Sequence, residues 1–271
     1  MRNNFKTLVL MATLGALFVA VGQILGGTSG ATIALVIAGV MNFAMYFFSH
    51  KIALAGAKAK PIEEQDLPKV FSIVRSLTQR EGMPMPKMYL IDSPQPNAFA
   101  TGRNPKHAAV AVTTGIVEMM DHAELEGVLA HELSHVKNRD ILISSIAATV
   151  AVALSFLVRL SFWTGMGRDR RNSNGLSAIV GILALVLAPL AAMVIQMAIS
   201  RSREYQADRS GAEITGSPLA LAQALAKLER GTSQIPMKID PSTAQLFIAD
   251  PLKAFGRKGS GGMGGMTRMF S

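Results

Sequence analysis

Cysteine is absent from this 271-residue sequence. The chain can therefore form no disulfide bond and can offer no thiolate to a metal ion. Any metal site has to be built from histidine and carboxylate side chains, and the chain has only five histidines. The absence of cysteine is also consistent with a reducing, cytoplasmic environment for the soluble parts of the protein.

Acidic residues are scarce, because 18 Asp and Glu stand against 27 Lys and Arg and the formal net charge is +9. Such an excess could indicate nucleic-acid binding, but the sequence has no recognisable nucleic-acid motif and no basic stripe with interleaved aromatic residues. Attraction to anionic lipid headgroups explains the charge more simply. We therefore expect a lipid bilayer as a partner, and no nucleic acid.

Charged residues are nearly absent from four long apolar segments, residues 8–25, 31–48, 141–163 and 178–199. Each segment is close to the ~20 residues that a helix needs to cross a bilayer. The first follows two basic residues, as a signal peptide would, but it leads almost directly into the second. The sequence thus predicts four transmembrane helices, of which the first two form a retained hairpin.

Basic residues flanking these segments predict the orientation of the chain. They precede the first segment and follow the second, whereas the short loop between these two has no charge. This pattern places the amino terminus, residues 49–140 and the carboxyl tail in the cytoplasm, although three arginines after the third segment would then lie outside. The residues concerned are Arg2, Lys6, Lys51, Lys58, Lys60, Arg168, Arg170 and Arg171.

Residues 130–139, A-H-E-L-S-H-V-K-N-R, carry the clearest chemical signal. His131 and His135 are four residues apart, so on a helix both imidazoles lie on one face and can reach a single metal ion. Two neutral imidazoles suit Zn²⁺, and Glu132 between them is a candidate general base for hydrolysis. Asp121, with Glu124 three residues later, predicts the start of this helix. A surface helix that carries these residues by chance is the weaker alternative.

A catalytic zinc site normally has a third protein ligand, which here has to be a carboxylate or one of the three remaining histidines. The best candidate region is residues 200–209, S-R-S-R-E-Y-Q-A-D-R. Glu204 and Asp208 share a helix face, so Glu204 could bind zinc while Asp208 accepts a hydrogen bond from a liganding histidine. Taken alone, the pattern is better explained as a solvated charged face, because neighbouring arginines offer ion-pair partners.

The soluble residues before the motif predict a helix followed by a small sheet. Residues 61–79 have apolar side chains at helical spacing, and residues 87–91 and 107–113 have the character of strands bounded by Gly- and Pro-containing turns. With residues 97–102 they give three short strands, followed by a short helical stretch over 114–120. An edge of this sheet could accept an extended peptide, but spacing alone slightly favours an ordinary sheet edge.

Four features together resemble the HtpX membrane metalloproteases, relatives of the CAAX prenyl proteases within the gluzincins. They are H-E-L-S-H at 131–135, E-Y-Q-A-D at 204–208, N-A-F-A-T-G at 97–102, and apolar segments placed two before and two between the metal motifs. The resemblance covers nearly the whole chain. It implies one Zn²⁺ per chain bound by His131, His135 and Glu204, with Glu132 as catalytic base and Asp208 orienting a ligand. It also implies a substrate-binding edge formed by Asn97, Ala98, Phe99, Ala100, Thr101 and Gly102.

The expected fold is a mainly α membrane protein with four transmembrane helices and a small α+β, zincin-like metalloprotease domain. Residues 5–48 and 141–199 would form transmembrane hairpins, and residues 49–140 and 200–271 the two parts of the protease domain, the second with a flexible tail. The resemblance implies an endopeptidase of the bacterial inner membrane that has its active site and both termini in the cytoplasm. Its substrates would be misfolded or damaged membrane proteins, cleaved in quality control and the stress response, and a homo-oligomer is compatible with the sequence.

Two other functions are compatible with the sequence. A CAAX-type processing protease would share the zinc site, but it would need a lipid-accommodating chamber, which four spans argue against. A catalytically silent zinc-binding scaffold is motivated by the last residues, because the sequence ends at Ser271 without the Thr-His-Pro-Pro stretch that usually follows the glycine-rich tail in this family. The resemblance implies that its histidine donates a hydrogen bond to the oxyanion.

Overall fold

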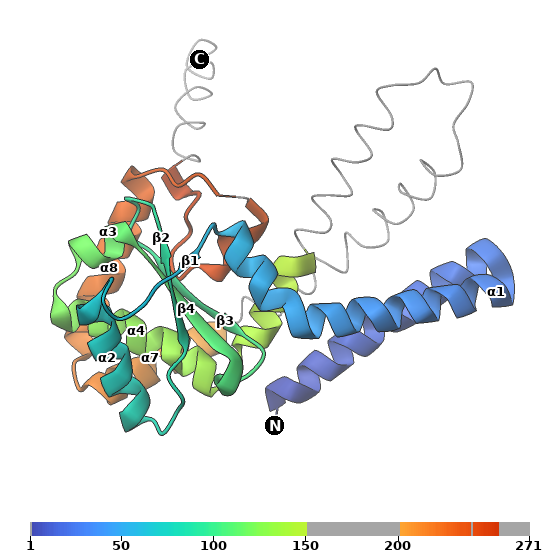
Figure 1. Cartoon of the computed structure of the whole chain (residues 1–271), viewed down its shortest axis with the longest axis horizontal. Helices are drawn as coiled ribbons and strands as arrows, with labels where there is room; N and C mark the ends of the chain where they lie inside the picture. The colour runs from blue at the N-terminus through green and yellow to red at the C-terminus, as the bar shows by residue number, and fades with distance from the viewer. Residues whose placement is uncertain (1, 151–200, 240, 255–271) are drawn as a thin grey trace, which may run out of the picture.

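The structure, a computed structural model, describes residues 2–150, 201–239 and 241–254 (Figure 1). A long helical hairpin extends from one side of a body that contains the sheet and the remaining helices. Three predicted parts lie outside the described residues. They are residues 151–163 of the third predicted span, the whole fourth span, and the predicted flexible tail from residue 256.

The hairpin is α1 (Arg2–Gly56), which consists of two helical arms joined by a sharp bend. The backbone leaves helical values at Gly26 and Gly27, and Gly27 has a φ of +60°, a region that glycine enters without steric cost. The arms approach closely at Gly22, where an added Cβ would lie 2.5 Å from the carbonyl oxygen of Gly30. Both arms of the predicted hairpin are therefore helical.

One described helical segment, Gly26–Gly56, is long and apolar enough to cross a membrane. Many of its large apolar side chains are exposed, with Ile33 61%, Val36 63% and Val40 65% accessible. A run of exposed apolar side chains of this size is unusual for a helix surrounded by water. A shorter apolar helical segment, Ile141–Val150, follows the metal motif and is the described beginning of the third predicted span.

The sheet has the strand order β1-β2-β4-β3. β2 (Lys87–Ile91) is parallel to β4 (Ala108–Thr113), whereas β1 (Lys60–Pro61) and β3 (Ala98–Gly102) are antiparallel strands at the two edges. The predicted strand over 87–91 is confirmed at both ends. The strand over 107–113 begins one residue later than predicted, because His107 ends the short 3-10 helix η1 (Pro105–His107).

The helix predicted over 61–79 begins later than expected, because Lys60 and Pro61 pair with Leu90 and Tyr89 of β2. A two-residue strand is too short to leave a periodic signal, so β1 escapes prediction. The helix itself, α2, starts with a proline in its first turn. The helices of the body are α2 (Pro68–Arg80), α3 (Thr114–Met119), α4 (His122–Lys137), α7 (Arg201–Thr215) and α8 (Pro218–Gln234), and η2 (Pro241–Leu246) is a second 3-10 helix.

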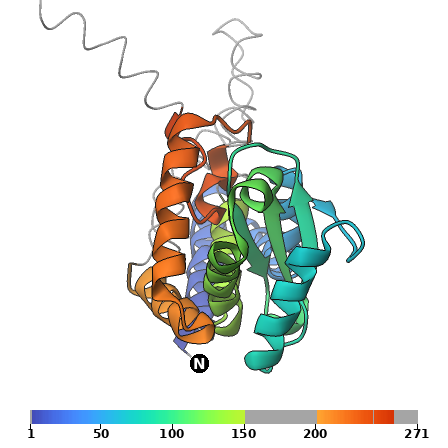
Figure 2. The same ribbon diagram turned by 90° about the vertical axis from the view of Figure 1, so that its left-hand side faces the viewer.

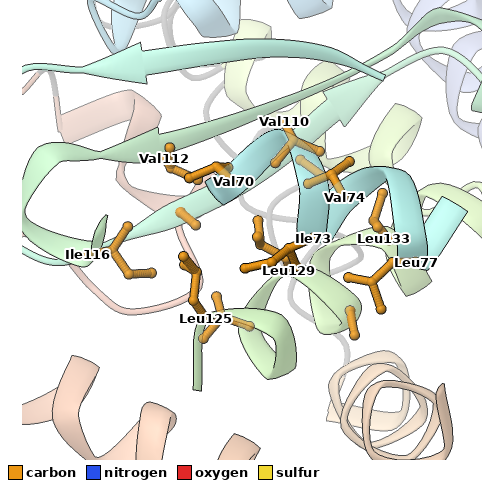
Figure 3. Close-up of a cluster of buried hydrophobic side chains, with 14 of the residues drawn as sticks. Val70, Ile73, Val74, Leu77, Val110, Val112, Ile116, Leu125, Leu129 and Leu133 are labelled. Atoms are coloured by element: carbon orange, nitrogen blue, oxygen red, sulfur yellow. The ribbon is translucent and has the colours of Figure 1, made fainter. Parts of the chain in front are cut away.

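The main hydrophobic core lies between the sheet and the helices α2 and α4 (Figure 3). Val110 and Val112 of β4 meet Val74 of α2 and Leu129 of α4, and all four side chains are fully buried. The intervening residues of β4 belong to a second cluster, which includes the last residues of α1. Because both faces of β4 are covered, the strand is apolar from Ala108 to Val112. On its other side α4 packs against α7 and α8 (Figure 2).

Truncation of Leu129 to alanine should lower the free energy of unfolding by about 2–5 kcal/mol, because a fully buried leucine leaves a cavity that its neighbours only partly fill. Leu219→Ala on α8, where the side chain is 67% exposed, is the matched control and should change stability by less than about 0.5 kcal/mol. Denaturant unfolding of the purified chain in detergent, followed by circular dichroism, measures both. Equal losses would contradict this description of the core.

Candidate metal centre

The helix that carries the metal motif, α4, begins with a capping box. Glu124 N–H donates to Asp121 Oδ1 at 2.9 Å, and Asp121 N–H donates to Glu124 Oε2 at 3.1 Å. This confirms the predicted start of the helix and satisfies two amide groups that otherwise lack a partner at a helix end. Because α4 lies between the sheet and the α7–α8 pair, its motif residues are enclosed by other elements.

The imidazole rings of His131 and His135 face each other, with their Nε2 atoms 3.2 Å apart. Nδ1 of His131 lies 2.9 Å from Asp208 Oδ1, and Nδ1 of His135 lies 3.2 Å from Asp140 Oδ2. Since a carboxylate only accepts, each Nδ1 carries the hydrogen and, in the neutral ring, Nε2 keeps its lone pair. Two lone pairs directed at each other over this distance are stable only when a cation lies between them.

Glu204 brings the third electron-rich atom to the same point. Its Oε2 lies 3.6 Å from His131 Nε2 and 3.7 Å from His135 Nε2, and the three ligand atoms all lie within 4.8 Å of one another. In a tetrahedral zinc site, bonds of about 2.0–2.1 Å separate the ligand atoms by roughly 3.3–3.5 Å. Two imidazoles and one carboxylate also leave a fourth position open for water. The arrangement thus fits a Zn²⁺ ion.

Glu204 and Asp208 reach the histidines because α7 packs closely against α4. Glu204, Asp208 and Gly211 recur at positions i, i+4 and i+7, so they lie along one face of α7. A Cβ built on Gly211 would lie only 3.1 Å from the backbone nitrogen of His131, so a larger residue would require the helices to shift by a few tenths of an ångström. A solvated, charged face, which is the alternative that spacing alone favoured, exists on another side of α7. There Arg209 forms an exposed ion pair with Glu213 at 2.8 Å.

Glu132 is buried beside the histidines, and only 4% of its surface is exposed. Its Oε2 accepts a hydrogen bond from Ala100 N–H of β3 at 2.8 Å, which ties the carboxylate to the sheet. Burial raises the pKa of Glu132 above its ordinary value, because the charged form loses its hydration. A carboxylate with a raised pKa is suited to accept a proton and to release it again.

The charges around the two rings favour a positive charge at their centre. Burial alone would lower the pKa of His135, but the hydrogen bond to Asp140 and the Glu204 carboxylate raise it to about 10. For His131, Asp208 and then Glu204 likewise outweigh burial and raise the pKa. Burial would raise the pKa of Glu204, but its contacts with both histidines hold it well below its usual range. The site therefore attracts protons when no metal is bound, and a divalent cation can replace them.

A cavity of about 440 Å³ opens at this cluster. His131, Glu132, His135 and Glu204 line it from one side, and residues 244–248 form part of its wall. Arg203 and Asp140 also line the cavity, and both are buried, with 7% and 4% of their surfaces exposed. Sequence reasoning did not assign a role to either residue. The one available signal for Asp140 was an acidic residue directly before an apolar segment.

The predicted substrate-binding edge is indeed an edge strand, but its first two residues are engaged by the carboxyl-terminal part of the chain. The carbonyl oxygen of Ala98 accepts a hydrogen bond from Ile248 N–H at 3.1 Å. Asn97 Nδ2 donates to the Ala249 carbonyl oxygen at 2.7 Å, and Ala249 N–H donates to Asn97 Oδ1 at 3.3 Å. Residues 248 and 249 therefore occupy the start of this edge.

The other four predicted edge residues have different surroundings. Ala100 lines the cavity, whereas Phe99 is packed in the cluster on the opposite face of the sheet. Thr101 Oγ1 is hydrogen-bonded to Ser145 Oγ at 2.6 Å, and Gly102 N–H donates to the same hydroxyl at 3.4 Å. Of the six residues, Ala100 is thus the one placed directly beside Glu132.

Comparison with known proteins relates the chain to a family of peptidases. The model of peptidase family M48 matches residues 64–255 of the chain. A protease HtpX homolog from Thermodesulfovibrio yellowstonii is 54% identical over 252 residues, which are 92% of this chain and 89% of that protein. A protease HtpX homolog from Methylibium petroleiphilum is 52% identical over 263 residues, 96% of this chain and 92% of that protein. The crystal structure of S. mikatae Ste24p, at 22% identity and a TM-score of 0.48, matches 90% of this chain, which spans 59% of that one.

Asp208→Asn and Asp140→Asn should each lower the affinity for Zn²⁺ by about 10- to 100-fold, because an amide no longer holds the Nδ1 proton as a carboxylate does. Asp92→Asn, at an exposed loop position, is the matched control and should leave the affinity unchanged. Competition with a chromogenic chelator in detergent measures the three affinities. Unchanged binding in both site variants would show that these carboxylates do not orient the ligands.

The affinity for Zn²⁺ should rise with pH up to about 10, because the metal-free His135 holds a proton up to that pH and must release it to bind metal. The pKa of this group is raised from 6.5 on folding, so its contribution to the stability of the metal-free chain is complete below about pH 6.5 and is lost as the pH rises through about 10. As the pH rises over this range, zinc titration should therefore show an increasing affinity, and thermal unfolding of the metal-free chain should show a decreasing stability. A zinc affinity that does not change with pH would contradict the proton competition.

Proposed function

Because the chain belongs to peptidase family M48 and is a metalloprotease, we propose that it is a membrane-embedded zinc endopeptidase with its catalytic centre on α4 and α7. In this proposal His131, His135 and Glu204 bind the metal and Glu132 is the catalytic base. The supporting observation is the convergence of two imidazole nitrogens and a Glu204 oxygen within 4.8 Å, beside a buried glutamate.

The chemistry then follows from the positions of these side chains. A single Zn²⁺ held by His131, His135 and Glu204 would polarise the scissile carbonyl and lower the pKa of a water molecule to about 7. Glu132, held by Ala100 N–H, takes a proton from the attacking water and passes it to the leaving amine. The carboxylate of Asp208 keeps the hydrogen of His131 on Nδ1, so that Nε2 remains available as a ligand.

Polypeptide substrates would bind as extended chains along the cavity-facing edge of β3. The beginning of this edge carries Ile248 and Ala249, so we propose that a substrate lies along the part from Ala100 onward. The N–H groups of Ala100 and Gly102 already donate to Glu132 and Ser145, so the substrate would pair there through backbone carbonyl oxygens of the strand. Backbone pairing of this kind tolerates many side chains, which suits a protease that acts on unfolded segments. Misfolded or damaged membrane proteins are the proposed substrate class, and quality control and the stress response the proposed role.

The proposed membrane placement rests on the elements next to the site. The metal helix leads after Asp140 into the apolar Ile141–Val150, and α1, which contains the membrane-length segment, contacts β3. We propose that residues 5–48 and 141–199 are transmembrane hairpins of a bacterial inner-membrane protein. Residues 49–140 and 200–271 would then form the protease domain on the cytoplasmic side, and self-association into a homo-oligomer would leave this arrangement intact.

Glu132→Gln should lower the cleavage of an unfolded soluble protein and of a membrane protein with an unfolded segment by about 10²- to 10⁴-fold, while zinc stays bound. The matched control is Glu126→Gln on the same helix, at a surface carboxylate paired with Arg80 at 3.0 Å, which should keep its activity. Purified chains are assayed in detergent for bound zinc and for chelator-sensitive cleavage. Zinc in all three chains with cleavage by none would favour the silent scaffold, and cleavage limited to prenylated peptides would favour CAAX-type processing.

A further inference from the structure

A second cavity of about 440 Å³ lies where the α1 hairpin joins the body, and we call it the hairpin-base cavity. Both arms of α1 contribute apolar and aromatic walls. Two loops of the body contribute polar side chains, one directly after β3 and one directly after α4. The lining residues are Leu8, Met11, Asn42, Phe43, Tyr46, Phe47, Arg103, Asn104, Arg139 and Leu142.

Two guanidinium groups give this cavity its charge. Arg103 lies over the ring of Phe47, with its Cζ 4.8 Å from the ring centroid, and Arg139 lines the cavity from the end of α4. Within the described part of the chain, neither arginine forms an ion pair with a carboxylate. Arginine is the side chain best suited to bind phosphate through paired N–H groups. The cavity therefore presents two guanidinium groups to an anionic ligand.

The other walls of the cavity belong to the ends of the two predicted spans. Leu8 is the first residue of the first span, and Phe43 and Tyr46 lie in the last turns of the second. A tyrosine at the end of a span, such as Tyr46, is typical of the membrane–water interface. Leu8 and Phe43 are 65% and 60% exposed, so they offer an apolar surface beside the arginines. A ligand that fits both walls has an anionic head and apolar chains.

We propose that the hairpin-base cavity binds an anionic phospholipid, with the phosphate between Arg103 and Arg139 and the acyl chains along Leu8 and Phe43. Basic pockets at the base of transmembrane helices are suited to such headgroups. A volume of about 440 Å³ is in the range of small-ligand sites. The proposal depends on the membrane placement of α1 but does not depend on the peptidase reaction.

The position of the two arginines gives the bound lipid a structural role. Arg103 directly follows β3, the strand whose Ala100 N–H holds Glu132. Arg139 directly precedes Asp140, the carboxylate that orients His135. A lipid bound by both arginines would hold the end of β3 and the end of α4 at one place on the hairpin, and hence fix the distance of the metal centre from the membrane.

The test uses the full chain with Glu132→Gln, which removes the proposed catalytic base, in detergent with equimolar phosphatidylglycerol and phosphatidylcholine. Native mass spectrometry should show preferential retention of phosphatidylglycerol. Arg103→Gln combined with Arg139→Gln should weaken this binding by roughly 10- to 30-fold, as expected for two basic residues at a membrane surface. The matched control, Lys69→Gln with Arg230→Gln, removes the same charge from α2 and α8, on the far side of the body from the hairpin, and should bind as the parent chain does (Figure 1).

Two further measurements distinguish a whole lipid from its phosphate group alone, and the loss of charge from a loss of folding. Inorganic phosphate, at a concentration equal to that of the lipid, should fail to displace phosphatidylglycerol, because it lacks the acyl chains; displacement would overturn the lipid assignment. Arg103→Lys with Arg139→Lys keeps both charges and should recover most of the binding. The proposal would be overturned if the lysine variant lost phosphatidylglycerol binding as the glutamine variant does. It would also be overturned if the Lys69→Gln, Arg230→Gln control lost binding to the same extent, or if the parent chain retained phosphatidylglycerol and phosphatidylcholine equally.

Discussion

The arrangement of the protein depends on two imidazole nitrogens that face each other at 3.2 Å. This contact is unfavourable for neutral rings unless a cation lies between them, and the surrounding carboxylates favour such a cation. Asp208 and Asp140 fix the hydrogens on the outer nitrogens, and Glu204 adds negative charge on the inner side. The structure therefore arranges these five side chains as a cation site requires, and the packed helices and sheet keep them together.

The side chains of the metal centre come from two helices that lie far apart in the sequence. The histidines lie on α4, whereas Glu204 and Asp208 lie on α7, after two apolar segments that both come between the motifs. Gly211 allows α7 to approach the backbone of His131, and Gly127 of α4 allows a similar approach by Leu221 of α8. Close helix packing thus converts two distant motifs into one centre. The cap at Asp121 contributes by fixing where α4 starts.

Much of this centre could be predicted from the sequence, because its parts are local. The i, i+4 spacing of His131 and His135 and the capping box are short-range patterns, and the structure has both. Residues that act through tertiary contacts are harder to predict: spacing alone favoured a solvated face for Glu204 and Asp208, and only the family resemblance implied their roles. Asp140 reaches His135 only because the chain turns after α4, and nothing in its neighbourhood marks that turn as part of a metal site. The strand β1 was not predicted for a related reason, because a strand of two residues has no periodic pattern in the sequence.

The same limit applies to the loop S-P-Q-P-N before β3, in which the sequence marks the first four residues only as a turn and Asn97 as the start of the substrate-binding edge. In the structure its two amide side chains bind the carboxyl-terminal part of the described chain. Gln95 Nε2 donates to the carbonyl oxygens of Ile235 at 2.5 Å and Pro251 at 3.0 Å. Asn97 pairs with both backbone groups of Ala249, much as a neighbouring strand would. Because residues 244–248 form part of the cavity wall, these two amides help to define the space in which a substrate would lie. Asn97 therefore shapes the site through the segment that it holds, even though Ala100 is the residue of its strand that lines the cavity.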